Sequence, residues 1–176
     1  MSVDLTVAAT RSTRSLNPTA VVIQADGLHL PFRTAQFDHS IAIGVLHHTL
    51  SARAGLAEMA RVTRPGGKVV VMLYSRWTPY HLVYLAASPL RRTMHVTVLD
   101  RLPRWILAVV RLAVAAQGRT RLPDEQLRRL LADQLWTPRA TFHSWKDIRL
   151  WARTLHMRVV WRKRLVCHAN LVMFER

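Results

Sequence analysis

Residues 39–74 decide the fold, and they read HSIAIGVLHHTLSARAGLAEMARVTRPGGKVVVMLY. The run 39–45 is short and rich in β-branched residues, which predicts a strand. From Ser51 apolar residues recur at helical spacing, until Pro65 and the two glycines after it predict a turn that ends the helix. Residues 68–74 are almost entirely apolar, as in a strand covered on both faces. Strand, helix and strand in this order predict a parallel βαβ unit.

The sequence before this unit predicts two more strands of the same sheet. Residues 20–24 form a short β-branched run that is typical of a buried strand. Asp4 follows a serine and a valine, which allows it to end an earlier strand, although a solvated aspartate near the N-terminus explains it as well. Residues 6–19 have a weak pattern that allows a helix or a loop. We therefore expect an α/β protein.

The sequence after residue 75 changes in character. Three helices are predicted between 77 and 135, at 80–87, 105–116 and 124–134, with Ser88-Pro89 separating the first helix from the second. Ser144 and Asp147 have the spacing of a capping box, which predicts a helix to about residue 155. The alternating runs 157–165 and 169–174 are close enough to predict an antiparallel hairpin.

The composition narrows the class of protein. The chain has 176 residues, half of them apolar, and a single cysteine, which favours one globular domain without an intrachain disulfide. No apolar stretch reaches the roughly 18 residues that a membrane-spanning helix needs, and no signal peptide is evident. A cytoplasmic location is therefore expected.

Positive charge is concentrated in the second half of the chain. The formal net charge is +16, and residues 76–176 hold 19 of the basic and six of the acidic side chains. Such an asymmetry favours an anionic partner, either RNA or an anionic membrane surface. An arginine-rich proteome explains the same numbers without any partner, so both explanations stay open.

Two positions could carry chemistry on these grounds alone. Asp26 follows the strand 20–24, at the edge where parallel sheets bind ligands, although an aspartate before Gly27 also suits a simple turn. His47 and His48 stand just past the strand 39–45, where one of them could act as a base. Capping or partial burial explains the two histidines equally well. No spacing typical of metal ligands occurs, so no metal is expected.

Four blocks of sequence resemble one known family. They read DGLHLPF from Asp26, FD from Phe37, IGVLHH from Ile43, and LAEMARVTRPGGK from Leu56. In this order and at this spacing they resemble the class I SAM-dependent methyltransferases, and among these the subgroup known as type 11. The resemblance is good over residues 2–75 and weaker over 141–175.

The resemblance implies a fold and a cofactor. The fold is a Rossmann-like sheet with a helical insertion after its fifth strand and a closing antiparallel hairpin. It implies one domain with three parts: a cofactor-binding part at 1–75, an insertion or lid at 76–140, and a closing helix and hairpin at 141–176. The cofactor is S-adenosyl-L-methionine (SAM).

The resemblance also implies roles for individual residues. Asp26 corresponds to the acid that binds the adenine amino group, and Asp4 to the acid that binds the ribose hydroxyls. The histidines correspond to the methyl-acceptor side, where His48 matters as a base if the acceptor must lose a proton. The remaining positions match the adenine pocket (Gly27 and Leu28) and the methionine part of SAM (Gly44 and Val45).

One part of the family pattern is not found. The glycine-rich loop that follows the family's central strand does not occur in residues 1–176. The expectation is therefore an N-terminally truncated sheet, in which the strand 20–24 is separated from the strand 39–45. Such a chain would be a fragment or a truncated gene model that binds SAM weakly.

The expected function is a SAM-dependent methyltransferase with an unknown methyl acceptor. The first alternative is a basic, methyltransferase-like pseudoenzyme that binds RNA or a partner subunit. The second is a lipid methyltransferase at the membrane surface, since 77–85 and 105–116 are apolar and tryptophan-containing, with arginines nearby. A helical lid over the acceptor explains those segments too.

Overall fold

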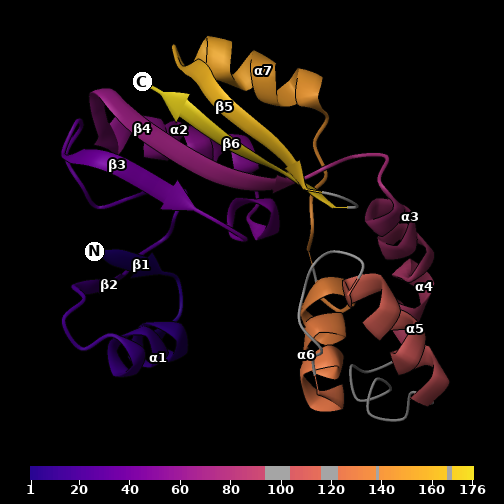
Figure 1. Cartoon of the computed structure of the whole chain (residues 1–176). Helices are drawn as coiled ribbons and strands as arrows, with labels where there is room; N and C mark the ends of the chain where they lie inside the picture. The colour runs from indigo at the N-terminus through magenta and orange to yellow at the C-terminus, as the bar shows by residue number, and fades with distance from the viewer. Residues whose placement is uncertain (94–103, 116–122, 138, 166–167) are drawn as a thin grey trace. The chain divides into compact units, whose positions relative to one another are not determined.

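The computed structural model describes residues 1–93, 104–115, 123–137, 139–165 and 168–176. Two compact units emerge from it (Figure 1). The first, here called the sheet unit, comprises residues 1–75, 141–165 and 169–176. The second, the helical unit, comprises the described residues of 76–140 together with residue 168. The predicted single-domain organisation is not tested by this division and stays a prediction.

A small two-stranded sheet opens the chain. β1 (Ser2–Asp4) and β2 (Val22–Gln24) pair in parallel, and α1 (Val7–Leu16) connects them. The side chain of Thr6 caps α1 by accepting a hydrogen bond from the Ala9 amide at 3.2 Å. The strands predicted to end at Asp4 and to span 20–24 are confirmed in existence and are three residues long.

A four-stranded mixed sheet forms the larger part of the sheet unit, in the order β3-β4-β6-β5. β3 (Phe37–Ala42) and β4 (Thr63–Tyr74) are parallel neighbours, which confirms the predicted βαβ unit. β5 (Arg158–Leu165) and β6 (Ala169–Glu175) form the predicted antiparallel hairpin, with β6 also antiparallel to β4. Among the described residues, β2 and β3 belong to separate sheets.

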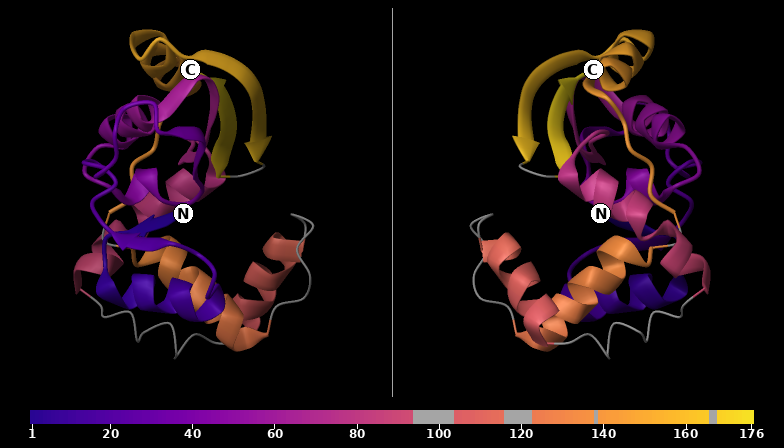
Figure 2. Two further views of the ribbon diagram at one scale, coloured as in Figure 1. Left: turned by 90° about the vertical axis from the view of Figure 1, so that its left-hand side faces the viewer. Right: turned by 90° about the vertical axis from the view of Figure 1, so that its right-hand side faces the viewer.

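Two helices cover one face of the four-stranded sheet (Figure 2). α2 (Ala52–Val62) and α7 (Trp145–Thr154) bury apolar side chains against the inward residues of β4 and β6. Ser144 and Asp147 form the predicted capping box at the start of α7. The core residues, almost all of them inaccessible to solvent, include Leu56, Val69, Val71, Leu73, Ile148, Val172 and Phe174.

The helical unit contains the helices predicted for this region. The three predicted helices are present as α3 (Pro79–Ala86), α5 (Arg104–Ala115) and α6 (Asp124–Leu135). A further helix that was not predicted, α4 (Ser88–Thr93), follows α3. Residue 116, the predicted end of the second helix, lies outside the described residues. The chain leaves the sheet unit at Ser75 and returns to it at Thr141. Ser75 and His143 then form a parallel bridge. The amide of His143 also donates to the carbonyl of Tyr74 at 2.9 Å.

Three local predictions need correction. The strand expected to reach residue 45 ends at Ala42, because Gly44 takes a φ of 78° and breaks the extended backbone. The Pro-Gly-Gly segment at 65–67 is not a separate turn; it lies inside β4, where the register with β3 shifts. Ser88-Pro89 begins α4, since proline is accepted in the first turn of a helix.

Candidate functional site

Two carboxylates stand at the carboxyl ends of neighbouring parallel strands. Asp4 is the last residue of β1 and pairs in register with Gln24, the last residue of β2. The amide of Ala25 donates to the carbonyl of Asp4 at 3.0 Å, which continues the pairing by one residue. Asp26 comes directly after it. The carboxyl ends of parallel strands lie at one edge of a sheet, so both predicted acids lie at the edge where such sheets bind ligands.

The carboxylate of Asp26 is oriented by its own turn. Its Oδ1 accepts a hydrogen bond from the amide of Leu28 at 2.8 Å, and its Oδ2 lies 3.5 Å from Nδ1 of His29. The side chain is 48% exposed, so Oδ2 keeps room to accept a hydrogen bond from a ligand. A methyl group added at Gly27 meets no atom within 4 Å, so the space beside the carboxylate is open.

Asp4 and its neighbours form a similar turn after β1. Oδ1 of Asp4 accepts from the amide of Thr6 at 3.2 Å, immediately before the N-terminus of α1. The side-chain amide of Gln24 donates to the carbonyl of Leu5 at 3.1 Å, which joins the ends of both strands. These bonds fix the backbone at the position from which Asp4 extends.

A partly buried ion pair holds the loop after Asp26. Glu58 and Arg61, one turn apart on α2, are joined by hydrogen bonds of 2.7 and 2.8 Å. Arg61 also donates to the carbonyls of Leu30 and Phe32, at 2.9 and 2.8 Å, while Glu58 accepts from the amide of Leu30 at 2.8 Å. The hydrogen bond from Arg61 is the main cause that lowers the pKa of Glu58, with the Leu30 amide and nearby charges adding to it against burial. The two residues therefore hold the loop in position.

Sequence analysis missed this role of Glu58 and Arg61. The pair has the acid-then-base spacing of helical neighbours, which is common on exposed helix faces and carries no information about a distant loop. The Leu30–Phe32 stretch is the partner, and it lies 28 or more positions away in the chain. Its Pro31, which fixes an extended backbone and leaves the carbonyls free of helical bonds, is the signal that the loop needs outside donors.

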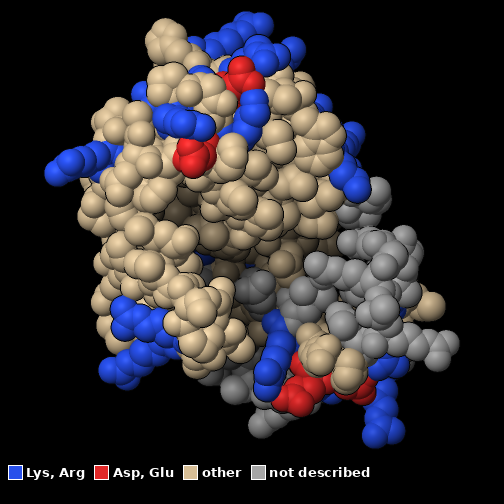
Figure 3. All heavy atoms as spheres, turned by 60° about the vertical axis from the view of Figure 1, so that its left-hand side comes forward, with Lys and Arg blue, Asp and Glu red and all other residues tan. Residues whose placement is uncertain are grey.

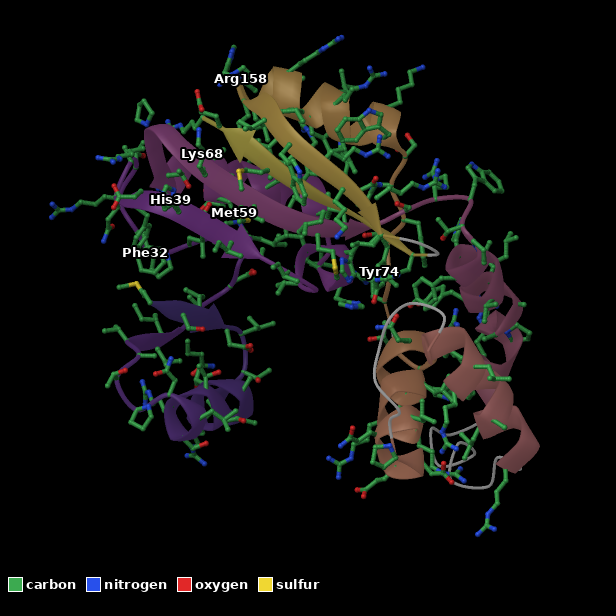
Figure 4. The ribbon with its side chains drawn as sticks, viewed as in Figure 1. Phe32, His39, Met59, Lys68, Tyr74 and Arg158 are labelled. Carbon is green, nitrogen blue, oxygen red and sulfur yellow. The ribbon has the colours of Figure 1, made fainter. Side chains whose placement is uncertain are left out.

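The second group of predicted residues follows β3 at the carboxyl edge of the four-stranded sheet. Gly44 has a left-handed backbone, and the side chain of Val45 is 51% exposed. The short 3-10 helix η1 (Leu46–His48) then places the two histidines. Figure 4 shows Tyr74 at this end of β4, whereas Lys68 and Arg158 lie toward the opposite end of the sheet.

The two histidines occupy different environments. His47 is fully buried, and its ring stacks on that of Tyr74 with 3.6 Å between centroids. Its Nδ1 lies 3.2 Å from the carbonyl oxygen of Met72, and its own carbonyl accepts from the amide of Thr141 at 2.8 Å. His48 is half-buried and meets Tyr74 edge-on at 5.6 Å. His47 is thus part of the packing, and His48 is the more accessible of the two.

A second charged cluster lies at the amino end of β4. Glu175 bonds to Lys68 and, at 3.1 Å, to Arg158, and hydrogen bonds from these two cations lower the pKa of its carboxyl. All the groups lie on strands and join them across the sheet. Within the described residues, no group of three or more His, Cys, Asp or Glu side chains is arranged to hold a metal ion.

The arrangement matches proteins of known structure and sequence. A SAM-dependent methyltransferase from Thermotoga maritima, described as a possible histamine N-methyltransferase, superposes with a TM-score of 0.61 at 11% identity, covering 99% of this chain and 72% of that one. At this identity the likeness concerns the fold. The fold is therefore the Rossmann-like fold of class I methyltransferases, as the resemblance implied.

The family described as "Methyltransferase domain" matches residues 1–71. A demethylmenaquinone methyltransferase from Beutenbergia cavernae is 36% identical over 87 residues, which are 48% of this chain and 36% of that protein. A ubiquinone/menaquinone biosynthesis C-methyltransferase from Ralstonia pickettii is 45% identical over 71 residues, 39% and 28% of the two chains. These matches span about a third of each relative. The similarity to the methyltransferase-domain family is thus carried by residues 1–71.

Proposed function

We propose that this chain takes part in SAM-dependent methyl transfer and that its first 75 residues bind the nucleoside of SAM. One observation carries the proposal: Asp4 ends one strand, Asp26 follows the end of its parallel neighbour, and each is oriented by a hydrogen bond from its own turn. The matching family and the fold support it.

The residues at this edge fit the nucleoside. The Oδ2 atom of the half-exposed Asp26 side chain can accept a hydrogen bond that the adenine amino group donates. The open space at Gly27 leaves room for a flat ring. Leu28 is half-buried and provides an apolar side to that ring. Asp4 suits the two ribose hydroxyls. When bound, SAM supplies an activated methyl group on a sulfonium, and the residues around it have to orient the acceptor and exclude water.

The residues beyond β3 are assigned to the other end of the cofactor. We assign Gly44 and Val45 to the methionine part, because both stand at the carboxyl end of a parallel strand. His48 is the candidate base for an acceptor that must lose a proton, since its ring is only partly covered. The burial of His47 against Tyr74 supports a positioning role for that histidine.

Calorimetric titration of the chain with SAM tests the proposal. Asp26→Ala is expected to weaken SAM binding by about 10- to 150-fold, because a hydrogen bond to a charged group contributes about 1.5–3 kcal/mol. Asp38→Ala is the matched control: that carboxylate lies on β3, is also exposed, and pairs with Arg64 of β4 at 2.8 Å. Equal SAM affinity in the wild type and Asp26→Ala would leave Asp26 as a turn residue and refute the assignment.

The partner of this activity is proposed from charge. Lys and Arg side chains outnumber acidic ones on the face shown in Figure 3, in line with the net charge of +16. We propose an anionic partner, with a membrane surface favoured over RNA because α3 exposes apolar side chains to solvent. RNA is the competing partner, and its binding would fall steeply with salt because phosphate contacts release counterions. None of the described helices has the length and apolar character required to cross a bilayer.

A further inference from the structure

Helix α3 of the helical unit buries polar side chains and exposes apolar ones. Its inward positions include His81 and Tyr84, both almost fully buried, whereas Leu82, Val83 and Leu85 are 50–56% exposed. Trp77, just before the helix, is 75% exposed. A helix on the surface of a globular protein usually has the opposite arrangement, with apolar residues inward and polar residues in water.

The polar groups of α3 are occupied inside the helical unit. The hydroxyl of Tyr80 donates to the carbonyl of Gln134 at 2.7 Å, and that of Tyr84 to the carbonyl of Thr137 at 3.2 Å. Arg91 of α4 lies over the Tyr84 ring, 3.7 Å from its centroid, and donates to the Tyr84 carbonyl at 2.7 Å. These contacts fix the rotation of α3 and so keep its apolar side outward.

The outward side of α3 carries no charge. Residues 79–86 contain no Asp, Glu, Lys or Arg. The one titratable side chain that could add a charge near neutral pH, His81, has its pKa lowered, by burial first and then by the nearby charge of Arg76. It accepts a hydrogen bond from the amide of Trp77 on Nδ1 at 3.1 Å, which fits a neutral ring.

Exposed cations lie at both ends of this apolar side. Arg76 precedes Trp77 and Arg92 lies on α4, and both are exposed. The amide of Arg91 donates to the carbonyl of Ala87 at 3.0 Å, so the helical hydrogen bonding runs on from α3 into α4. Along that path the exposed positions Leu82, Leu85, Pro89 and Arg92 follow each other at helical spacing. The segment 76–93 contains no acidic residue.

We propose that this surface, formed by Trp77, Leu82, Val83, Leu85 and the flanking Arg76 and Arg92, binds an anionic lipid bilayer. The apolar side chains enter the boundary between headgroups and acyl chains, Trp77 lies at headgroup level, and the arginines contact lipid phosphates. α3 is eight residues long and lies along the surface. Charge complementarity selects a bilayer, because a purely apolar protein partner leaves the cations at both ends without counter-charges. The proposal rests on the anionic-partner part of the proposed function and does not depend on SAM binding.

Vesicle flotation with the full chain tests the proposal. Vesicles of phosphatidylcholine with about a third phosphatidylglycerol are expected to bind the protein, and vesicles of phosphatidylcholine alone to bind it much more weakly. The double variant Leu82→Glu/Leu85→Glu is expected to lower binding to anionic vesicles by at least about tenfold. Arg92→Ala should lower it by about fivefold, because each basic residue near the surface contributes roughly 1 kcal/mol. Leu150→Glu on α7, where the side chain is 57% exposed, is the matched control and should bind as the wild type does.

A second measurement reports where the bilayer lies. Brominated lipids are expected to quench the tryptophan fluorescence of the wild type, and Trp77→Phe should lose most of that quenching. Circular dichroism checks that each variant keeps its helices, and SAM titration of the double variant separates loss of lipid binding from loss of cofactor binding.

Three outcomes overturn the proposal. Vesicle binding that is equal in the wild type and the double variant would move the contact to another basic surface. A dimer that light scattering detects without lipid, and that the double variant abolishes, would make a second copy the occupant. Binding of RNA that competes with vesicles and is lost in the double variant would assign the surface to nucleic acid.

Discussion

The two sheets of the sheet unit differ greatly in how they are supported. β4 has 12 residues and pairs on both sides, and its inward side chains Val69, Val71 and Leu73 are inaccessible to solvent. β1 and β2 have three residues each and pair only with one another among the described residues. Only Val22 among their side chains is buried. Stability therefore comes from the four-stranded sheet, whereas the candidate nucleoside residues lie on the small one.

This contrast explains the importance of the Glu58–Arg61 pair. α2 packs on the four-stranded sheet, and its two charged residues hold the loop that begins after Asp26. The small sheet thus obtains part of its order from the large one. Binding sites are often built on loops that a rigid scaffold positions, and here the contacts that do so can be named.

The largest effect is expected from the core of the four-stranded sheet. Phe174→Ala should lower the free energy of unfolding by about 3–5 kcal/mol, because the ring is fully buried and leaves a cavity. Val22→Ala on β2 should lower it by less than about 1 kcal/mol, since a weakly supported sheet opens before global unfolding. Urea denaturation followed by circular dichroism measures both. A loss of about 2 kcal/mol or more in Val22→Ala would show that the two sheets unfold as one unit.

Among the candidate site residues, substitution of a buried side chain should lower stability more than substitution of a partly exposed one. His47→Ala is expected to cost about 2–3 kcal/mol, because the variant loses a buried ring stacked on Tyr74. Asp26→Ala and His48→Ala should each cost less than about 1 kcal/mol, since these side chains are partly exposed. Thermal and urea unfolding of the three variants give the comparison. Equal losses for His47 and His48 would mean that burial does not separate their roles.

Two glycines, one in the four-stranded sheet and one beside the small sheet, provide a sharper test of the difference between the sheets. A methyl group at Gly67 would lie 2.4 Å from the backbone oxygen of Asp38, so Gly67→Ala must push β4 away from β3. The expected cost is about 2 kcal/mol. Gly27→Ala, with nothing within 4 Å, should change stability by less than about 0.5 kcal/mol. A neutral Gly67→Ala in denaturant unfolding would mean that the register shift in β4 absorbs the added atom.

The smallest effect concerns pH. The folded-state pKa of Glu58 is lowered below its ordinary value, so its contribution is present above about pH 4.5 and is lost as the pH falls through the folded-state pKa. Glu58→Gln should therefore cost about 1 kcal/mol at pH 7 and progressively less below pH 4. Urea unfolding at several pH values measures this convergence. Glu125→Gln, an exposed pair with Arg129 on α6, is the control and should change little. If the free energies of unfolding of the wild type and Glu58→Gln differed by the same amount at every pH, the ionisation of Glu58 would not contribute to stability.

Much of the fold followed from periodicity. The alternation and apolar runs placed β2 to β6, and the Ser144 capping box placed α7, because these patterns depend on neighbours within a few residues. The end of β3 at Ala42 could not be predicted, since a glycine is compatible with either backbone and only the structure shows the φ of 78° at Gly44. The contacts between α2 and Leu30 lie beyond any local pattern. Roles for Asp4 and Asp26 came from the family resemblance, since the residues alone favoured a turn aspartate at 26 and a solvated aspartate at 4.

The bridge between Ser75 and His143 bears on how such a chain tolerates changes in length. Ser75 and His143, on either side of the helical unit, are paired in the sheet unit. The intervening segment is therefore a loop whose two ends are held together at one place. The entropic cost of closing a loop rises only logarithmically with its length, so doubling the segment would lower the free energy of unfolding by about 0.6 kcal/mol. Selection can therefore lengthen, shorten or exchange residues 76–140 with little penalty to the scaffold. The segment proposed to contact a partner can diverge in this way while residues 1–75, proposed to bind the cofactor, stay the same.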